Sequence, residues 1–92
     1  MSKIRMAVVG AGQFGRRHMR AIRECGRAEL AAVVDTNRDS ADQAASEFAC
    51  QACASVAELS GKVDAAVVAV PTTAHADTGC ALMEAGVDVL VE

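Results

Sequence analysis

Aromatic residues are scarce in this sequence, and the shortage argues against one class of function. Neither Trp nor Tyr occurs among the 92 residues, and Phe14 and Phe48 are the two phenylalanines. Proteins that bind single-stranded nucleic acids stack the bases on aromatic side chains. The formal net charge of −3 also opposes a general attraction to phosphate backbones. We therefore expect no nucleic-acid partner.

Long apolar runs are lacking as well. The longest, residues 65–70, is far shorter than the roughly 20 residues of a membrane-spanning helix, and the first nine residues hold no stretch of signal-peptide length. We expect no membrane partner and a cytoplasmic location. The four cysteines (Cys25, Cys50, Cys53 and Cys80) are accordingly expected to be reduced and buried.

What the chain has is a regular alternation of β-branched runs with stretches of helical period, within a length that suits one domain. Strands are expected at residues 4–9, 29–35, 51–54, 64–70 and 87–91. Helices are expected at 13–25, 39–49, from 55 for one or two turns, and from Thr72 or Thr73 to 85. The main strands are apolar throughout, which is typical of a parallel sheet covered on both faces. The sequence predicts an α/β, doubly wound Rossmann fold of about five strands, ending before the sixth.

The apolar periodicity also predicts which side of each helix faces the sheet. For the first helix the expected inner residues are Phe14, His18, Ala21, Ile22 and Cys25. For the second they are Ala41, Ala44, Ala45 and Phe48.

A glycine-rich loop follows the first strand and opens the first helix. Residues 10–15 read Gly-Ala-Gly-Gln-Phe-Gly. In this pattern Gly10 permits a tight turn, Gly12 leaves room for a pyrophosphate, and Gly15 lets the helix lie close to the strand. The free N–H groups at the helix start then face the phosphates. The loop predicts a dinucleotide site.

Asp35 supports this interpretation, because it ends the second strand 35 − 15 = 20 residues after the last glycine of the loop. At that distance a carboxylate reaches the hydroxyls of the adenosine ribose. Such a carboxylate repels a 2′-phosphate, which favours NAD over NADP. Arg38 leaves the choice more open: it could stack on adenine, pair with a 2′-phosphate, or be an exposed arginine at a helix start.

A second constellation follows the strand at 64–70. Pro71 ends that strand, Thr72 and Thr73 can cap the next helix or bond a ribose or phosphate, and His75 lies in its first turn. Ligands of doubly wound sheets bind at the carboxyl ends of the strands. A single histidine, however, is more often structural or exposed than a ligand-binding group.

The glycine loop, Val-Val-Asp35, Pro71-Thr72-x-x-His75 and the stretch Gly86-Val-Asp-Val-Leu-Val-Glu92 together resemble the N-terminal half of Gfo/Idh/MocA oxidoreductases. The resemblance implies an NAD(P)-binding half of a dehydrogenase that acts on a sugar or cyclitol. In that family the last strand continues into Glu-Lys-Pro, whose Lys acts on the substrate hydroxyl, and a second domain supplies the substrate contacts. A chain ending at Glu92 is expected to lack both.

The resemblance also assigns roles to residues. Those expected to line the pyrophosphate are Gly10, Gly12, Gln13, Phe14 and Gly15. Asp35, and less firmly Arg38, would meet the adenosine. Pro71, Thr72 and His75 would flank the ribose on the nicotinamide side, with Glu92 nearby.

Other patterns favour ordinary structural roles. The arginines at positions 16, 20, 23 and 27 form a stripe that fits a solvated helix face better than a phosphate contact. The Cys50–Cys53 pair follows a helix instead of opening one, so two ordinary thiols are favoured over a redox pair or metal site.

Two functions remain open at this point. The first is the cofactor-binding domain of an oxidoreductase, and the alternative is a non-enzymatic module that senses NAD. With strand order 3-2-1-4-5, the strand at 87–91 would be an apolar edge, so self-association through it is also expected.

Overall fold

The computed structural model describes residues 3–69 and 86–91. In chain order the elements are β1 (Ile4–Val9), α1 (Gln13–Glu24), β2 (Ala28–Val34), α2 (Arg38–Phe48), β3 (Gln51–Cys53), the 3₁₀ turn η1 (Val56–Leu59), β4 (Ala65–Val68) and β5 (Asp88–Val91). The predicted helix that ends at residue 85 lies outside the described residues. The strand predicted at 64–70 is shorter, because β4 ends at Val68, although the Ala69 N–H still donates a 2.8 Å hydrogen bond to the Val9 carbonyl.

The five strands form a single parallel sheet with the order β3-β2-β1-β4-β5. This order confirms the doubly wound Rossmann fold predicted from the alternation of strands and helices. The strand order reverses beside β1, because β2 and β4 pair with its opposite edges. Ligands of this fold class bind at such a reversal, outside the carboxyl ends of the strands.

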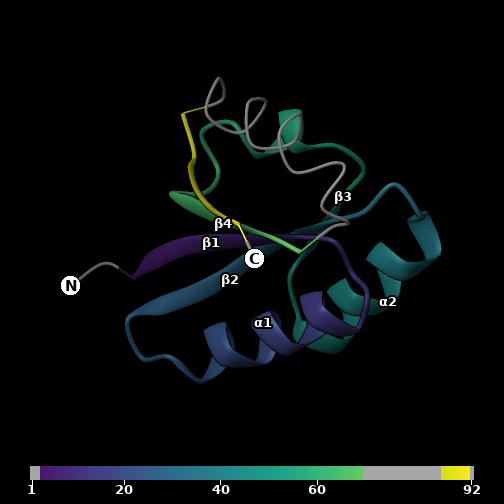
Figure 1. The fold of residues 1–92 in the computed structure, drawn as a ribbon, viewed down its shortest axis with the longest axis horizontal. Helices are drawn as coiled ribbons and strands as arrows, with labels where there is room; N and C mark the ends of the chain where they lie inside the picture. Colours follow the sequence, from purple (N-terminus) through teal and green to yellow (C-terminus); the bar gives the residue numbers. More distant parts are fainter. Residues whose placement is uncertain (1–2, 70–85, 92) are drawn as a thin grey trace.

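Both faces of the sheet are covered in the described structure, which accounts for the apolar strands. α1 and α2 lie together on one face, and η1 lies on the other (Figure 1). Val8 and Val33 pack with the two helices, whereas their neighbours Val9 and Val34 pack on the face that carries Leu59 of η1. The strand side chains therefore alternate between two apolar layers, and neither layer is exposed to water.

The predicted inner face of α2 is confirmed, but the predicted inner face of α1 is confirmed only at Ile22 and is otherwise wrong. In α1 the buried residues are Gly15, Met19 and Ile22, whereas Phe14 is 61% exposed. The helix is rotated by about one residue from the predicted phase because Gly15 is the residue that packs on the sheet. A glycine carries no hydrophobic signal, so the periodicity placed Phe14 there instead.

The boundaries of the second strand and second helix each lie one residue before the predicted ones. For α2 the reason is a cap: the Asn37 side chain accepts a hydrogen bond of 3.2 Å from the Ser40 N–H. That bond satisfies one of the donors that a helix start leaves without an acceptor. The predicted short helix from residue 55 is η1, and it starts with a capping box in which Glu58 Oε2 accepts a 3.0 Å bond from the Ser55 N–H.

The arginine stripe of α1 serves partly to join α1 to α2. Arg16 forms an ion pair with Glu47, and the guanidinium carbon of Arg23 lies 4.7 Å from the centre of the Phe48 ring. Arg17 lies over Phe14 within α1 itself. The predicted solvated face is therefore confirmed for the exposed Arg20, Arg23 and Arg27, whereas Arg16 is half-buried in its ion pair.

The cysteines differ from the expectation in one respect. Cys53 is buried and Cys50 is half-buried, but Cys25 is exposed at the end of α1. Cys50 and Cys53 belong to the apolar layers on opposite faces of the sheet. Burial raises the pKa of both thiols, and the charge of Glu58 raises the pKa of Cys53 further. Raised pKa values disfavour thiolate formation, so the pair has the character of ordinary thiols.

Candidate functional site

The site begins where β1 ends. The Gly10 N–H donates a 2.7 Å hydrogen bond to the Val34 carbonyl, which carries the sheet pairing one residue past the strand. Gly10 then has φ 108°, a conformation that side chains with a Cβ rarely adopt. This turn sends the chain from the sheet directly into α1, as the loop sequence predicted.

Gly15 lies against the turn, and its lack of a side chain is essential there. A Cβ atom on Gly15 would lie 1.8 Å from the Gly10 carbonyl oxygen and 2.8 Å from the Gly10 carbonyl carbon. Both are backbone atoms, so neither can move aside as a flexible side chain would. The predicted role of Gly15, close packing of helix on strand, is confirmed by this geometry.

Gly12 is different, because nothing lies within 4 Å of the position that its Cβ would take. It is the N-cap of α1, and no side chain caps the helix start. The first N–H groups of α1 have no acceptor within the helix, and the positive end of the helix dipole lies at the same place. Open space in front of such donors suits an anionic group.

Asp35 connects the glycine loop to the end of β2. Its Oδ2 accepts a 2.9 Å hydrogen bond from the Ala11 N–H, and its Oδ1 accepts a 2.8 Å bond from the Asn37 N–H. Two backbone donors thus fix the carboxylate beside the loop. Each oxygen keeps a second lone pair, so the group can still accept hydrogen bonds from a ligand. The hydrogen bond to Ala11 was not foreseen from the sequence.

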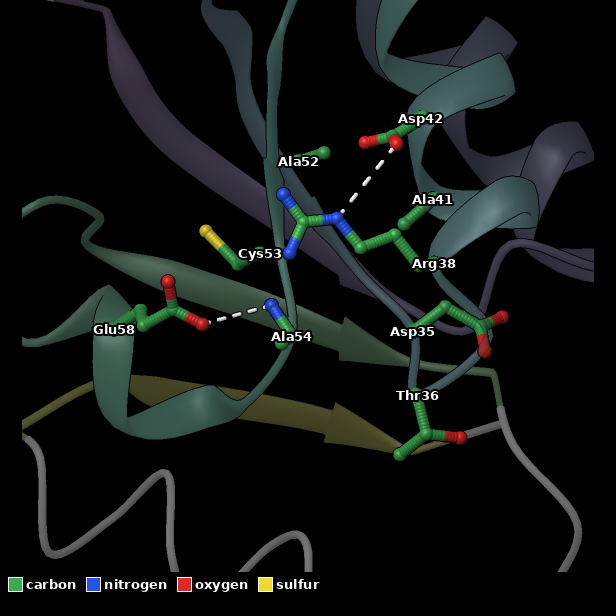
Figure 2. A pocket seen from close by; sticks show the side chains of 9 residues that line it. All are labelled: Asp35, Thr36, Arg38, Ala41, Asp42, Ala52, Cys53, Ala54 and Glu58. Carbon is green, nitrogen blue, oxygen red and sulfur yellow. Dashed lines mark hydrogen bonds and ion pairs between the residues drawn. The ribbon is translucent and has the colours of Figure 1, made fainter.

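A cavity of about 140 Å³ opens beside Asp35. It lies between the ends of β2 and β3, the start of α2, and η1 (Figure 2). Its charged lining residues are Asp35, Arg38, Asp42 and Glu58. In the view of Figure 2, the Asp35 carboxylate turns away from the Arg38 guanidinium. Asp35 therefore lies between the glycine loop and the cavity.

Arg38 extends from α2 over this cavity and lines it together with Asp35. Its Nε lies 3.8 Å from Asp42 Oδ2, one helical turn away, and the Arg38 side chain is 83% exposed. On the facing wall, hydrogen bonds from the backbone N–H groups of Ser55 and Ala54 lower the pKa of Glu58. The charges of Lys62 and Arg38 lower it further.

The structure thus brings together part of the predicted site. The start of α1 holds Gly10, Gly12, Gly15 and the exposed residues Gln13 and Phe14. Asp35 is bonded to this loop through Ala11, and Arg38 lines the cavity together with Asp35. Pro71, Thr72, His75 and Glu92 lie outside the described residues. The sequence reasoning missed Asp42 and Glu58 as lining residues. Two signals were present: Asp42 lies four residues after Arg38, and Glu58 belongs to the capping box.

Two kinds of feature are absent from the part of the chain that the structure describes. No group of three or more His, Cys, Asp or Glu side chains is arranged to hold a metal ion within residues 3–69 and 86–91. Among the same residues, no helix has the length and apolar character to cross a membrane.

The site geometry agrees with comparisons to known proteins. Residues 4–92 match the family model described as "Oxidoreductase family, NAD-binding Rossmann fold". The chain is 37% identical over 92 residues to UDP-N-acetylglucosamine 3-dehydrogenase of Acidithiobacillus ferrooxidans, covering all of this chain and 29% of the relative. It is 32% identical over 75 residues to inositol 2-dehydrogenase of Rhizobium meliloti, covering 80% of this chain and 23% of the relative. The chain therefore spans less than a third of these relatives.

Solved structures show the same likeness. GenD2 from gentamicin A biosynthesis, in complex with NAD, matches with a TM-score of 0.93 and 28% identity over 99% of this chain and 27% of its own. The Acidithiobacillus ferrooxidans dehydrogenase matches with a TM-score of 0.90 and 35% identity over 99% of this chain and 30% of its own. The resemblance noted in the sequence is confirmed. This chain belongs to the Gfo/Idh/MocA oxidoreductase family and forms the NAD-binding Rossmann fold of that family.

Proposed function

We propose that this chain binds NAD with its pyrophosphate on the start of α1 and its adenosine ribose at Asp35. The observation that carries the proposal is the open space at Gly12 in front of the uncapped N–H groups of α1. Gln13 and Phe14 would line the same approach, and the Asp35 carboxylate lies between this loop and the cavity. Arg38 would cover the adenine side. Pro71, Thr72, His75 and Glu92 would meet the nicotinamide side.

We further propose that the chain is the cofactor-binding part of a dehydrogenase acting on a sugar or cyclitol hydroxyl. The support is that relatives at 37% and 32% identity are named for UDP-N-acetylglucosamine and inositol. Bound NAD would supply a hydride acceptor, and this part of the protein would hold and orient it. The sensing alternative has no comparable support.

The free cysteines of the described residues fit a cytoplasmic location.

The NAD site can be tested by filling the open space at Gly12. We expect Gly12→Val to weaken NAD binding at least 10-fold, because the added side chain would occupy the pyrophosphate approach. The Cβ position itself has no protein atom within 4 Å. Isothermal titration calorimetry measures the affinity and thermal unfolding monitors the fold. The matched control is Gly26→Val, where a Cβ also meets nothing within 4 Å. Equal binding by both variants would disprove the proposed pyrophosphate position.

We expect residues 1–92 alone to bind the cofactor without dehydrogenase turnover. In longer relatives this region makes up less than a third of the chain. Binding a cofactor does not by itself place a substrate carbon against it. The measurement is NADH formation, followed by absorbance, from a panel of sugars and polyols. Steady NADH formation by the purified 92 residues would contradict this expectation.

We also propose that the 92-residue chain associates with a second copy through β5. In the described structure β5 is the last strand of the order and pairs with β4 alone. Open N–H and C=O groups on an apolar edge favour pairing with another strand. We expect Val89→Lys to lower the association constant in sedimentation experiments, whereas Gln51→Lys on the opposite edge strand should not. A wild-type chain that stays monomeric at high concentration would refute the proposal.

A further inference from the structure

The charges around the cavity are unequal, and this inequality bears on which dinucleotide the site accepts. Its lining contains three carboxylates, Asp35, Asp42 and Glu58, and one guanidinium, Arg38. The carboxylates come from three different elements: the end of β2, the body of α2, and η1. Carboxylate residues therefore line the cavity from several elements, although the Asp35 carboxylate itself turns toward the glycine loop.

Arg38 is the lining residue that could attract a 2′-phosphate, but two carboxylates act on it. Asp42 Oδ2 lies 3.8 Å from its Nε within the same helix. Glu58 faces it from η1, close enough for the Arg38 charge to favour the ionised carboxylate. Figure 2 shows Arg38 extending from α2 toward Cys53 and Ala54, with Asp42 and Glu58 on either side of it. Lys62 lies outside the lining and also acts on Glu58.

Glu58 is well suited to hold a fixed negative charge at this place. Its Oε2 accepts hydrogen bonds of 2.7 Å from the Ala54 N–H and 3.0 Å from the Ser55 N–H. These bonds orient the carboxylate and keep it on the wall of the cavity. Without them the side chain would rotate into solvent. The capping box of η1 thus stabilises the start of η1 and also fixes a negative charge on the cavity wall.

We propose that Asp42 and Glu58 are specificity-determining residues, which neutralise Arg38 and so disfavour the binding of a 2′-phosphate. This inference rests on the proposed NAD site. In this arrangement Arg38 contributes its flat guanidinium and apolar stem to the cavity without supplying net positive charge. Asp35 repels the phosphate directly, whereas Asp42 and Glu58 remove the attraction that Arg38 would otherwise provide. All three carboxylates then favour NAD.

The test compares NAD and NADP affinities by calorimetry in Asp42→Asn, Glu58→Gln and the double variant. Each substitution removes a charge with little change in shape, and the amide oxygen introduced by Glu58→Gln can still accept the capping hydrogen bonds. We expect the NAD/NADP affinity ratio to fall about 3-fold in each single variant and about 10-fold in the double variant, at low salt. The matched control is Asp39→Asn, which removes the same charge from α2 outside the lining.

A further variant separates neutralisation of Arg38 from a general loss of negative charge. Adding Arg38→Ala to the double variant should abolish most of the gain in NADP affinity. The gain is expected to come from attraction between the Arg38 guanidinium and the 2′-phosphate, once the charges of Asp42 and Glu58 are removed. The inference is wrong if the double variant binds NAD but keeps the wild-type NAD/NADP affinity ratio. It is also wrong if Asp39→Asn lowers that ratio as much as the double variant does. In both cases the proposed NAD site stands. If the wild-type chain binds neither cofactor, both are wrong.

Discussion

Gly15→Ala is expected to destabilise the fold by about 2–4 kcal/mol. The new methyl group would lie 1.8 Å from the Gly10 carbonyl oxygen, so α1 and the β1 turn must separate. Met19 and Ile22 lie on the same side of α1 and would lose packing with the sheet. For a domain of this size, the loss corresponds to roughly 10–25 °C in the thermal midpoint.

Thermal or urea unfolding monitored by circular dichroism measures this effect. Gly26→Ala is the matched control, because a Cβ there meets nothing within 4 Å and the residue does not have a positive φ. The control is expected to change the free energy of unfolding by less than about 0.5 kcal/mol. Equal stabilities of the two alanine variants would show that Gly15 does not set the distance between α1 and β1.

The contrast between Gly12 and Gly15 shows how far the sequence could predict the site. The spacing of the glycines predicted different roles, a phosphate approach at Gly12 and close packing at Gly15. The structure confirms the packing role and shows the open space at Gly12. The packing prediction for Gly15 succeeded because close approach depends on backbone geometry, and a three-glycine loop between a strand and a helix leaves few backbone paths. The phosphate approach at Gly12 stays a prediction.

The fold was predictable for a related reason. The main strands are mostly apolar, with Arg5 in β1 and Glu29 in β2 as exceptions, and each is bounded by a clear break, such as Gly10 after β1 or Asp35 after β2. The strand order followed from the fold class. The rotation of α1 was not predictable from hydrophobicity, because its contact with the sheet begins at a glycine and leaves Phe14 exposed. A buried glycine has no signal in a pattern of apolar side chains.

The cavity was the least predictable part. It is formed by residues from β2, α2, β3 and η1, so its lining depends on how four segments meet in space. Asp42 and Glu58 each had a sufficient local explanation, a helical ion pair with Arg38 and a capping box. Local patterns therefore accounted for both residues without indicating that they face one cavity.

The wild-type chain is expected to bind NAD more tightly than NADP, and Asp35→Ser is expected to narrow or reverse the difference. The 2′-phosphate of NADP carries about two negative charges, and like charges a few ångströms apart cost of order 1–4 kcal/mol near a protein surface. This cost corresponds to roughly 5- to 1000-fold in affinity. Arg38 remains in the serine variant and would then face the phosphate with one carboxylate fewer beside it.

Asp35 also holds the glycine loop through the Ala11 N–H, so the serine variant could weaken both cofactors by loosening the loop. Asp35→Asn separates the two effects, because its side-chain carbonyl can keep one of the two backbone hydrogen bonds while the charge is lost. We expect both variants to lower the NAD/NADP affinity ratio in calorimetric titrations, and the serine variant alone to lower the affinity for both. Equal affinities of the wild-type chain for the two cofactors, or a ratio that neither substitution changes, would mean that Asp35 does not contact the ribose.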